Sequence, residues 1–270
     1  MEEARVRPSA VTLVAYSEIA VKGRKRSLME NLLKEQIRKK LFWWGVRSRV
    51  FMEQGRIVIT GKAPENLRRV PGVHHLAYAW RLPKLPPEEL AQAISFIIRE
   101  ADQFAVRVRR ADKRYPMRSN ELAALIGSKI EGEANLSSPK LVIYVEIRND
   151  VYLYTSNDIL EGVGGLPYGV EGRAYVLGEG EELLLMAALM ARRGVEVVLS
   201  RYEEGVGNLV EALPKPLRIS KERFCPIVSS SKTECPTIIP TRPCVPKKTL
   251  EKAKLLLNRE VEWEICGEGR

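Results

Sequence analysis

Strand-like and helix-like periodicities follow one another through the first 82 residues in an order that few folds accommodate. Residues 11–16 are apolar and β-branched, as in a buried strand, whereas apolar side chains recur at helical spacing from Leu28 until Gly45 ends the pattern. The predicted elements are a strand over residues 11–16, a helix over 26–44, strands over 46–52 and 56–60, a short helix from Pro64 and a strand over 73–82. This β-α-β-β-α-β order is that of a ferredoxin-like unit.

A proline-rich stretch, residues 82–87, separates this unit from a second one that has its own helices and strands. The predicted elements are helices over residues 88–102 and 121–134, a strand over 104–108, and a hairpin of strands 140–147 and 151–155 around Asn149-Asp150. The glycine-rich segment 162–169 is then typical of a connection between domains.

The last hundred residues begin with one βαβ unit and then lose their regular pattern. We expect a strand over residues 174–177, a helix over 181–193 and a strand over 195–200. Residues 214–249 hold seven of the 16 prolines, so mostly irregular structure is expected there before a helix over residues 249–257. The chain is therefore predicted to be a multidomain protein of the α/β and α+β classes.

The positive charge of the chain is unevenly distributed. The net charge is +10, and Lys and Arg exceed Asp and Glu by nine within residues 1–75, by none within 76–170 and by one within 171–270. Such an excess over one part of the chain indicates a polyanionic partner, either a nucleic acid or an anionic membrane. The alternative is a solvated basic surface without a partner.

Two dense groups of basic residues concentrate this charge. The N-terminal cluster, Lys22, Arg24, Lys25 and Arg26, lies where the helix over residues 26–44 begins, and exposed backbone N–H groups there favour a phosphate ligand. The strand–loop cluster comprises the six basic residues of Phe104–Arg118, namely Arg107, Arg109, Arg110, Lys113, Arg114 and Arg118. Like charges repel at this density, whereas each phosphate that they neutralise releases counterions and adds affinity. Because two clusters on successive domains suit a folded RNA better than a membrane plane, we predict both as RNA phosphate contacts.

Neither a metal site nor a membrane segment is expected. The four cysteines, Cys225, Cys235, Cys244 and Cys266, lack the C-x-x-C spacing of zinc sites, and both free thiols and a disulfide stay open for them. The longest apolar run, residues 183–191, is far shorter than the roughly 20 residues that span a bilayer. Residues 1–10 lack the apolar core of a signal peptide, so we expect a soluble, cytoplasmic protein with no membrane partner.

Four ordered segments of the chain resemble the tRNA 4-thiouridine synthetases, the ThiI family. They are Tyr16–Arg26, Phe104–Pro116, Ile143–Arg148 and Gly162–Gly169. The resemblance implies an N-terminal ferredoxin-like domain over residues 1–75, a THUMP domain over 76–168 and an ATP-pyrophosphatase (PP-loop) domain over 169–270. It also implies that the first two domains bind tRNA and present its acceptor end to the third.

The third domain departs from the family pattern at the loop that holds ATP in the family. The family carries Ser-Gly-Gly-x-Asp-Ser between a strand and a helix, and the matching residues here are Gly178, Glu179, Gly180, Glu181, Glu182 and Leu183. The three glutamates place negative charge where a pyrophosphate would lie, and each like-charge pair at roughly 4 Å costs about 4 kcal/mol at an effective dielectric constant of about 20. The segment is also shorter than the family's catalytic domain. We therefore expect a truncated, degenerate PP-loop-like domain that has lost ATP as its cofactor.

These observations predict a tRNA-binding protein without ATP-dependent thiolation activity of its own and without an assigned catalytic residue. Two alternatives remain from the same residues. One is an active ATP-dependent tRNA sulfurtransferase with a divergent loop. The other is an adaptor that presents tRNA to a separate catalytic subunit.

Overall fold

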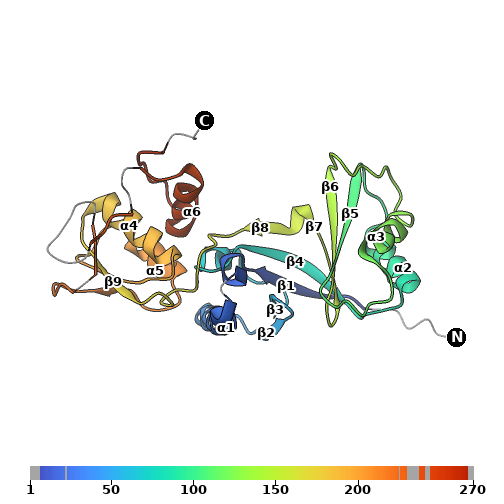
Figure 1. The fold of residues 1–270 in the computed structure, drawn as a ribbon, viewed down its shortest axis with the longest axis horizontal. Helices are drawn as coiled ribbons and strands as arrows, with labels where there is room; N and C mark the ends of the chain where they lie inside the picture. The colour runs from blue at the N-terminus through green and yellow to red at the C-terminus, as the bar shows by residue number, and fades with distance from the viewer. Residues whose placement is uncertain (1–6, 22, 225, 230–236, 241–243, 267–270) are drawn as a thin grey trace. The chain divides into compact units, whose positions relative to one another are not determined.

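A computed structural model describes residues 7–21, 23–224, 226–229, 237–240 and 244–266 of the chain (Figure 1). The described residues form two compact units whose segments interleave along the sequence. The first unit comprises the residues up to Val14 with Ser48–Ala63 and Ala77–Leu160, and the second comprises Ala15–Arg47, Pro64–Leu76 and the residues from Glu161 onward. Both contain helices and strands, so the mixed α/β class that the sequence predicts is confirmed.

The first 161 residues contain the predicted β-α-β-β-α-β order, with a 3-10 helix (η) in place of the second α-helix. The elements are β1 (Ser9–Ala15), η1 (Glu18–Val21), η2 (Gly23–Lys25), α1 (Arg26–Trp43), β2 (Val50–Glu53), β3 (Arg56–Thr60), η3 (Glu65–Arg69), β4 (His75–Leu82), α2 (Pro87–Ile97), β5 (Phe104–Arg110), α3 (Ser119–Gly127), β6 (Leu141–Ile147), β7 (Val151–Thr155), η4 (Ser156–Asp158) and β8 (Ile159–Glu161).

Eight strands of the described residues form one sheet in the order β2-β3-β1-β4-β7-β6-β5, with β8 beside β4. The pairs β1–β3, β2–β3, β4–β7 and β6–β7 are antiparallel, whereas β5 and β6 run parallel. The β4–β7 pairing, from Trp80 opposite Leu153 to Leu82 opposite Val151, joins the ferredoxin-like strands to those that follow in one continuous sheet. Helices α2 and α3 cover the β5–β6 end of this sheet with a shared apolar core (Figure 1).

Two helices of the first unit end earlier than the sequence predicts. The helix expected over residues 88–102 ends at Ile97, and the one expected over 121–134 ends at Gly127. The prediction for residues 128–134 is wrong, because the chain turns after Gly127, and Glu131 and Ala134 form isolated bridges with Glu100 and Phe104. Gly132 has a φ of +132°, and a Cβ added there would lie 1.9 Å from the carbonyl oxygen of Ala101, so glycine permits this close approach where other residues do not.

The C-terminal part of the second unit is a parallel α/β domain. Its elements are β9 (Arg173–Val176), α4 (Gly180–Arg192), β10 (Glu196–Leu199), α5 (Val206–Ala212), β11 (Arg218–Ile219), β12 (Ile227–Val228), β13 (Thr237–Ile238) and α6 (Lys247–Leu257). The described strands are ordered β11-β10-β9-β12-β13, and the predicted βαβ unit is confirmed as β9-α4-β10. Residues 183–191 of α4 are buried in a core shared with α5 and α6, so the longest apolar run of the chain belongs to a core helix.

The glycine-rich segment 162–169 is a buried, hydrogen-bonded part of the second unit. The amide of Gly164 donates to the carbonyl oxygen of Val73 at 2.7 Å, and that of Leu166 donates to the carbonyl oxygen of Arg192 at 3.0 Å. Gly165, with a φ of +82°, approaches so closely that an added Cβ would lie 1.9 Å from the Arg192 carbonyl oxygen. The glycines therefore allow tight packing against the end of α4.

No helix in the described part of the chain combines the length and apolar character needed to cross a membrane.

Candidate nucleic-acid interface and C-terminal cavity

The strand–loop cluster stands on β5 and on the loop between β5 and α3, within the first unit. Arg107 and Arg109 are exposed and alternate with the half-buried Val108, so both lie on one face of the strand. The other exposed members of the cluster are Lys113, Arg114 and Arg118. Arg110 is half-buried, and its guanidinium donates to the carbonyl oxygen of Tyr115 at 3.0 Å. The cluster therefore presents five exposed cations, while Arg110 stabilises the turn that carries them.

A buried carboxylate fixes this basic loop. Asp112 is 8% exposed and accepts hydrogen bonds from the backbone amide of Arg114 at 3.0 Å, from Arg114 Nε at 3.1 Å and from Lys84 Nζ at 2.8 Å. The Arg114 side chain first, and then Lys84, hold the pKa of Asp112 well below its usual range. Asp112 thus stays ionised and orders the loop. Lys84 extends the basic surface, and sequence inspection misses it because its partner lies 28 residues further on.

The N-terminal cluster lies at the start of α1, in the second unit. Lys22 is outside the described residues, whereas Arg24 and Lys25 are exposed in η2. The first turn of α1 has no acidic residue, and its N-cap residue Lys25 makes no side-chain capping bond. Uncapped N–H groups at the positive end of a helix favour an anion.

The last residue of the N-terminal cluster, Arg26, is engaged by a neighbouring carboxylate. Arg26 Nε donates to Glu30 at 2.7 Å, and the hydroxyl of Tyr16 donates to the same carboxylate. Burial first, and then the hydrogen bond to Glu30, raise the pKa of Tyr16 to about 12, which keeps this donor protonated. Arg26 thus orients the start of the helix, and Arg24 and Lys25 present the exposed charge.

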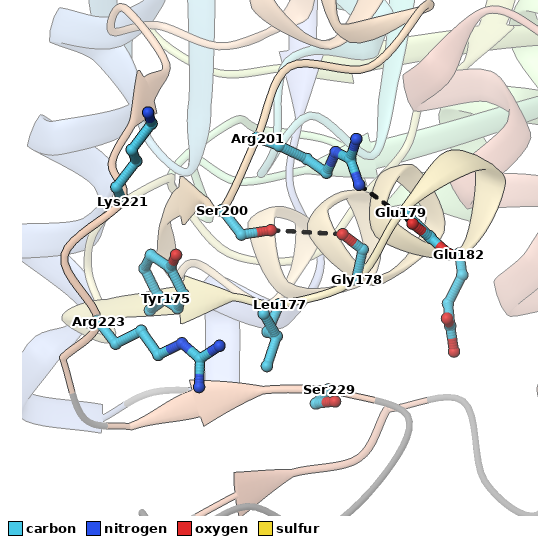
Figure 2. A pocket seen from close by; sticks show the side chains of 10 residues that line it. All are labelled: Tyr175, Leu177, Gly178, Glu179, Glu182, Ser200, Arg201, Lys221, Arg223 and Ser229. Atoms are coloured by element: carbon cyan, nitrogen blue, oxygen red, sulfur yellow. Dashed lines mark hydrogen bonds and ion pairs between the residues drawn. The ribbon is translucent and has the colours of Figure 1, made fainter.

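A cavity of about 720 Å³ opens at the carboxyl edge of the C-terminal parallel sheet (Figure 2). Strand β9 pairs with β10 on one side and with β12 on the other, and the crevice beyond such a reversal of strand order is the usual ligand site of an open parallel sheet. The lining residues are Tyr175, Leu177, Gly178, Glu179, Glu182, Ser200, Arg201, Lys221, Arg223 and Ser229.

The loop predicted from the sequence, residues 178–183, connects β9 to α4 and forms part of this cavity. Glu179 forms an ion pair with Arg201 at 3.1 Å, and the hydroxyl of Ser200 donates to the carbonyl oxygen of Gly178 at 3.3 Å (Figure 2). On the first turn of α4, Glu181 pairs with Arg259 at 3.1 Å. The loop is therefore bound to side chains of its own domain.

Sequence inspection missed the basic residues of the cavity. Arg201, Lys221 and Arg223 line it together with Glu179 and Glu182. Within the described part of the chain, neither Lys221 nor Arg223 forms an ion pair. These two residues lie in a segment predicted to be irregular, where no periodicity indicates that the chain returns to the sheet edge.

The described cysteines form a disulfide. Cys244 and Cys266 are joined, 22 residues apart, which settles the alternative that the sequence left open for this pair. Cys225 and Cys235 lie outside the described residues. Among the described side chains, no group of three or more His, Cys, Asp or Glu residues is arranged to hold a metal ion.

Comparison with family models identifies two domains. A ThiI ferredoxin-like domain matches residues 11–77, and a THUMP domain matches residues 89–156. The boundaries at residues 75 and 168 stay a prediction, because the two compact units divide the chain differently.

Among curated proteins, the chain is similar to the probable tRNA sulfurtransferase of Clostridium perfringens, with 36% identity over 202 residues, covering 68% of this chain and 51% of the relative. The probable tRNA sulfurtransferase of Coxiella burnetii is 33% identical over 183 residues, covering 62% of this chain and 47% of the relative. The chain thus spans about half the length of these relatives.

Two solved structures share the fold. PH1313 from Pyrococcus horikoshii superposes with a TM-score of 0.72 at 24% identity, over 92% of this chain and 99% of that one. A 4-thiouridine synthetase, solved in complex with RNA and with bound ATP, superposes with a TM-score of 0.59 at 24% identity, over 78% of this chain and 61% of that one. With its ThiI ferredoxin-like and THUMP domains and its sequence similarity to these relatives, the chain belongs to the tRNA sulfurtransferase family.

Proposed function

We propose that this protein binds tRNA through its two basic clusters and carries out no ATP-dependent thiolation by itself. The observation that carries the proposal is the row of exposed cations on β5 and its loop, held in place by the buried Asp112. A loop fixed in this way presents its charges without first having to be ordered by the ligand, which favours binding of a polyanion. The names of the relatives and the RNA bound to the 4-thiouridine synthetase support tRNA as that polyanion.

The residues of the C-terminal cavity do not fit a triphosphate. Glu179 and Glu182 line the cavity. Arg201, which also lines it, already forms ion pairs with Glu179 and Glu203. Glu181 and Glu182 lie in the first turn of α4 and already complement its positive end. A phosphate oxygen at roughly 4 Å from either cavity carboxylate would cost about 4 kcal/mol at an effective dielectric constant of about 20. We infer that ATP is not a cofactor of this chain.

Charge reversal of exposed cluster residues tests the RNA proposal. We expect Arg107→Glu, Arg109→Glu and Lys113→Glu together to weaken binding of purified tRNA roughly 100-fold at about 100 mM salt, since three phosphate contacts become repulsive. The matched control reverses Lys62, Arg99 and Lys129, which lie in the same unit outside both clusters. Fluorescence anisotropy gives both affinities, and equal losses in the two triple variants would contradict the assignment of the site.

A second candidate function, an active ATP-dependent sulfurtransferase, is favoured by the cavity and by Lys221 and Arg223, two cations that line it and form no ion pair with any described residue. Calorimetry with Mg·ATP in the presence of tRNA separates the two. Binding heat that disappears in Arg223→Glu, together with nucleotide-dependent thiolation of tRNA, would establish the enzyme. Absence of both supports the non-catalytic proposal.

An adaptor role extends the non-catalytic proposal to a separate catalytic subunit. Such a subunit is expected to co-purify with the chain from its native source in an RNA-dependent manner. An isolated chain in gently lysed extracts would argue against this extension.

A further inference from the structure

Two elements of the ferredoxin-like part, α1 and η3, belong to the same compact unit as the C-terminal α/β domain. We propose that this domain, residues 161–266, is a scaffold that positions the N-terminal cluster, an inference that rests on the proposed RNA binding. A domain whose cavity does not fit ATP would then still contribute to the affinity for RNA. The proposal follows from three sets of contacts, on η3, on α1 and on η1.

The first set centres on a buried arginine of η3. Arg69 is 2% exposed, and its guanidinium donates to Glu211 at 3.0 Å, to the carbonyl oxygen of Asn208 at 2.6 Å and to that of Leu256 at 3.2 Å. These acceptors belong to α5 and to the last turn of α6. Asn66 adds a hydrogen bond to Glu211 at 3.1 Å. Separating η3 from the C-terminal domain would leave these groups without partners, which is costly for a buried charge.

The second set lies on one face of α1. Gln36 is buried, and its amide nitrogen donates to the carbonyl oxygen of Tyr168 at 2.7 Å. Lys40 lies four residues further on, hence on the same face, and is also buried. Glu211, the acceptor of Arg69, acts favourably on the charge of Lys40. The C-terminal half of α1 is therefore hydrogen-bonded to Tyr168, and Glu211, which accepts from Arg69, also stabilises the charge of Lys40.

The third set lies just before the N-terminal cluster. Glu18 in η1 forms an ion pair with Arg192 at 3.4 Å, and Arg192 Nε donates to the carbonyl oxygen of Val163 at 2.8 Å. Arg192 is the last residue of α4. The N-terminal cluster thus lies between Glu18 and Gln36, two residues that are both held by the C-terminal domain.

Contacts on both sides of the cluster reduce the freedom that its residues lose when RNA binds. The C-terminal domain adds no positive charge next to Arg24 and Lys25. It raises the affinity for RNA by restricting the conformations of these two residues. A group held in its bound geometry binds more tightly because less conformational entropy is lost on association. Arg69 and Gln36 are accordingly positioning residues that act through Arg24 and Lys25.

The test loosens the scaffold without changing the cluster. Arg69→Met removes the buried guanidinium, and Arg173→Met is its matched control, because Arg173 lies in the same compact unit, carries the same charge and pairs only with Glu196 among the described residues. We expect Arg69→Met to weaken tRNA binding about fivefold and Arg173→Met to leave it unchanged. Gln36→Leu alters no charge, and it replaces Arg69→Met if that variant does not fold by circular dichroism.

Two further measurements separate positioning from general stability. Amide hydrogen exchange of RNA-free protein is expected to accelerate at residues 17–28 in Arg69→Met and in Gln36→Leu. In a chain that already carries Arg24→Glu and Lys25→Glu, Arg69→Met should cause no further loss of affinity, since the residues it acts through are gone. Unchanged exchange at residues 17–28, or a full additional loss in that background, would overturn the scaffold proposal. A wild-type chain that does not bind tRNA would contradict the proposed function instead, while the exchange data still decide whether this domain orders the cluster.

Discussion

Glu146 is a carboxylate that the fold buries and surrounds with donors. It is 4% exposed and lies 2.8 Å from Arg56, 2.6 Å from Arg148 and 3.0 Å from the hydroxyl of Tyr154. Burial by itself raises the pKa of Glu146, but Arg56 and Arg148 outweigh that effect and hold the pKa below its ordinary value. The two arginines come from β3 and from the turn after β6, so the carboxylate joins distant parts of the first unit.

Replacing this carboxylate should destabilise the first unit. We expect Glu146→Gln to lower the free energy of unfolding by about 3–5 kcal/mol, because two buried guanidinium groups lose their counter-charge. The stability that ionised Glu146 contributes is complete at neutral pH and is lost as the pH falls through its lowered pKa. The free energy of unfolding of the variant should therefore decrease less steeply at acidic pH than that of the wild type. Urea denaturation between pH 3 and pH 7 measures both effects. Tyr154→Phe, which removes one hydrogen bond, should cost only about 1 kcal/mol.

Lys40 is a buried amine for which, unlike Glu146, the effect of burial on the pKa outweighs that of the neighbouring charges. Its Nζ lies 5.3 Å and 5.1 Å from the ring centroids of Trp43 and Trp44. Burial lowers the pKa of Lys40 from 10.5 to about 8, although Glu211 opposes the shift. The folded state therefore releases this proton at a lower pH than the unfolded state does.

Stability should consequently rise with pH above about 8. Between pH 7.5 and pH 9.5 the unfolded chain binds more protons than the folded one, which adds about 2 kcal/mol to the free energy of unfolding. Lys40→Met removes this increment and flattens the profile. Urea denaturation at the two pH values compares the proteins, and an equal slope for both would contradict the assignment to Lys40.

Sequence inspection predicted the exposure of the strand–loop cluster better than the contacts that hold it. Five members of the strand–loop cluster are exposed as expected, because arginine density on a short segment is visible in one dimension. Asp112 and Lys84 form a pair across 28 residues, and Glu146 reaches Arg56 across 90, so no local spacing reveals either pair. The basic residues of the cavity were missed for the same reason.

At the scale of elements, periodicity predicted most of the strands and the two longest helices, α1 and α4. Periodicity failed to predict the segments whose backbone conformation depends on tertiary contacts. Residues 128–134 have a helical pattern, yet Glu131 and Ala134 form bridges with Glu100 and Phe104. Helix α5 was not predicted because its seven residues are too few for a clear apolar stripe. The strands β11, β12 and β13 have two residues each and depend on a neighbour: β11 pairs with β10, β12 pairs with β9, and β13 pairs with β12.

The Cys244–Cys266 disulfide joins the residues that precede and follow helix α6 in the sequence. A bridge across 22 residues restricts the unfolded chain and should contribute about 3 kcal/mol to stability. We expect the double variant Cys244→Ser, Cys266→Ser to lose that amount in urea denaturation. Adding a reductant should lower the free energy of unfolding more in the wild type than in the double variant, which lacks this disulfide. An equal decrease in both proteins would contradict the stabilising role of the disulfide.

At the scale of the whole molecule, the two basic clusters lie in different compact units, and the proposal assigns both to one RNA. The salt dependence of binding tests this directly. Replacing Arg107 and Lys113 by Ala should reduce the slope of log affinity against log salt by about 2, and replacing Arg24 and Lys25 should reduce it by about 2 more. Titrations at several salt concentrations give the slopes. If one pair leaves the slope unchanged, the corresponding cluster does not contact the RNA.

The pairing of β4 with β7 has a consequence for dividing the molecule. The two family-model matches end and begin on either side of residues 78–88, which invites a cut there. Such a cut would strip β7 of its partner along Val151–Leu153 and expose a row of free amide and carbonyl groups. Edges of this kind recruit strands from other chains. An isolated THUMP fragment of this protein is therefore expected to self-associate, and its aggregation would reflect the missing neighbour rather than a poor sequence.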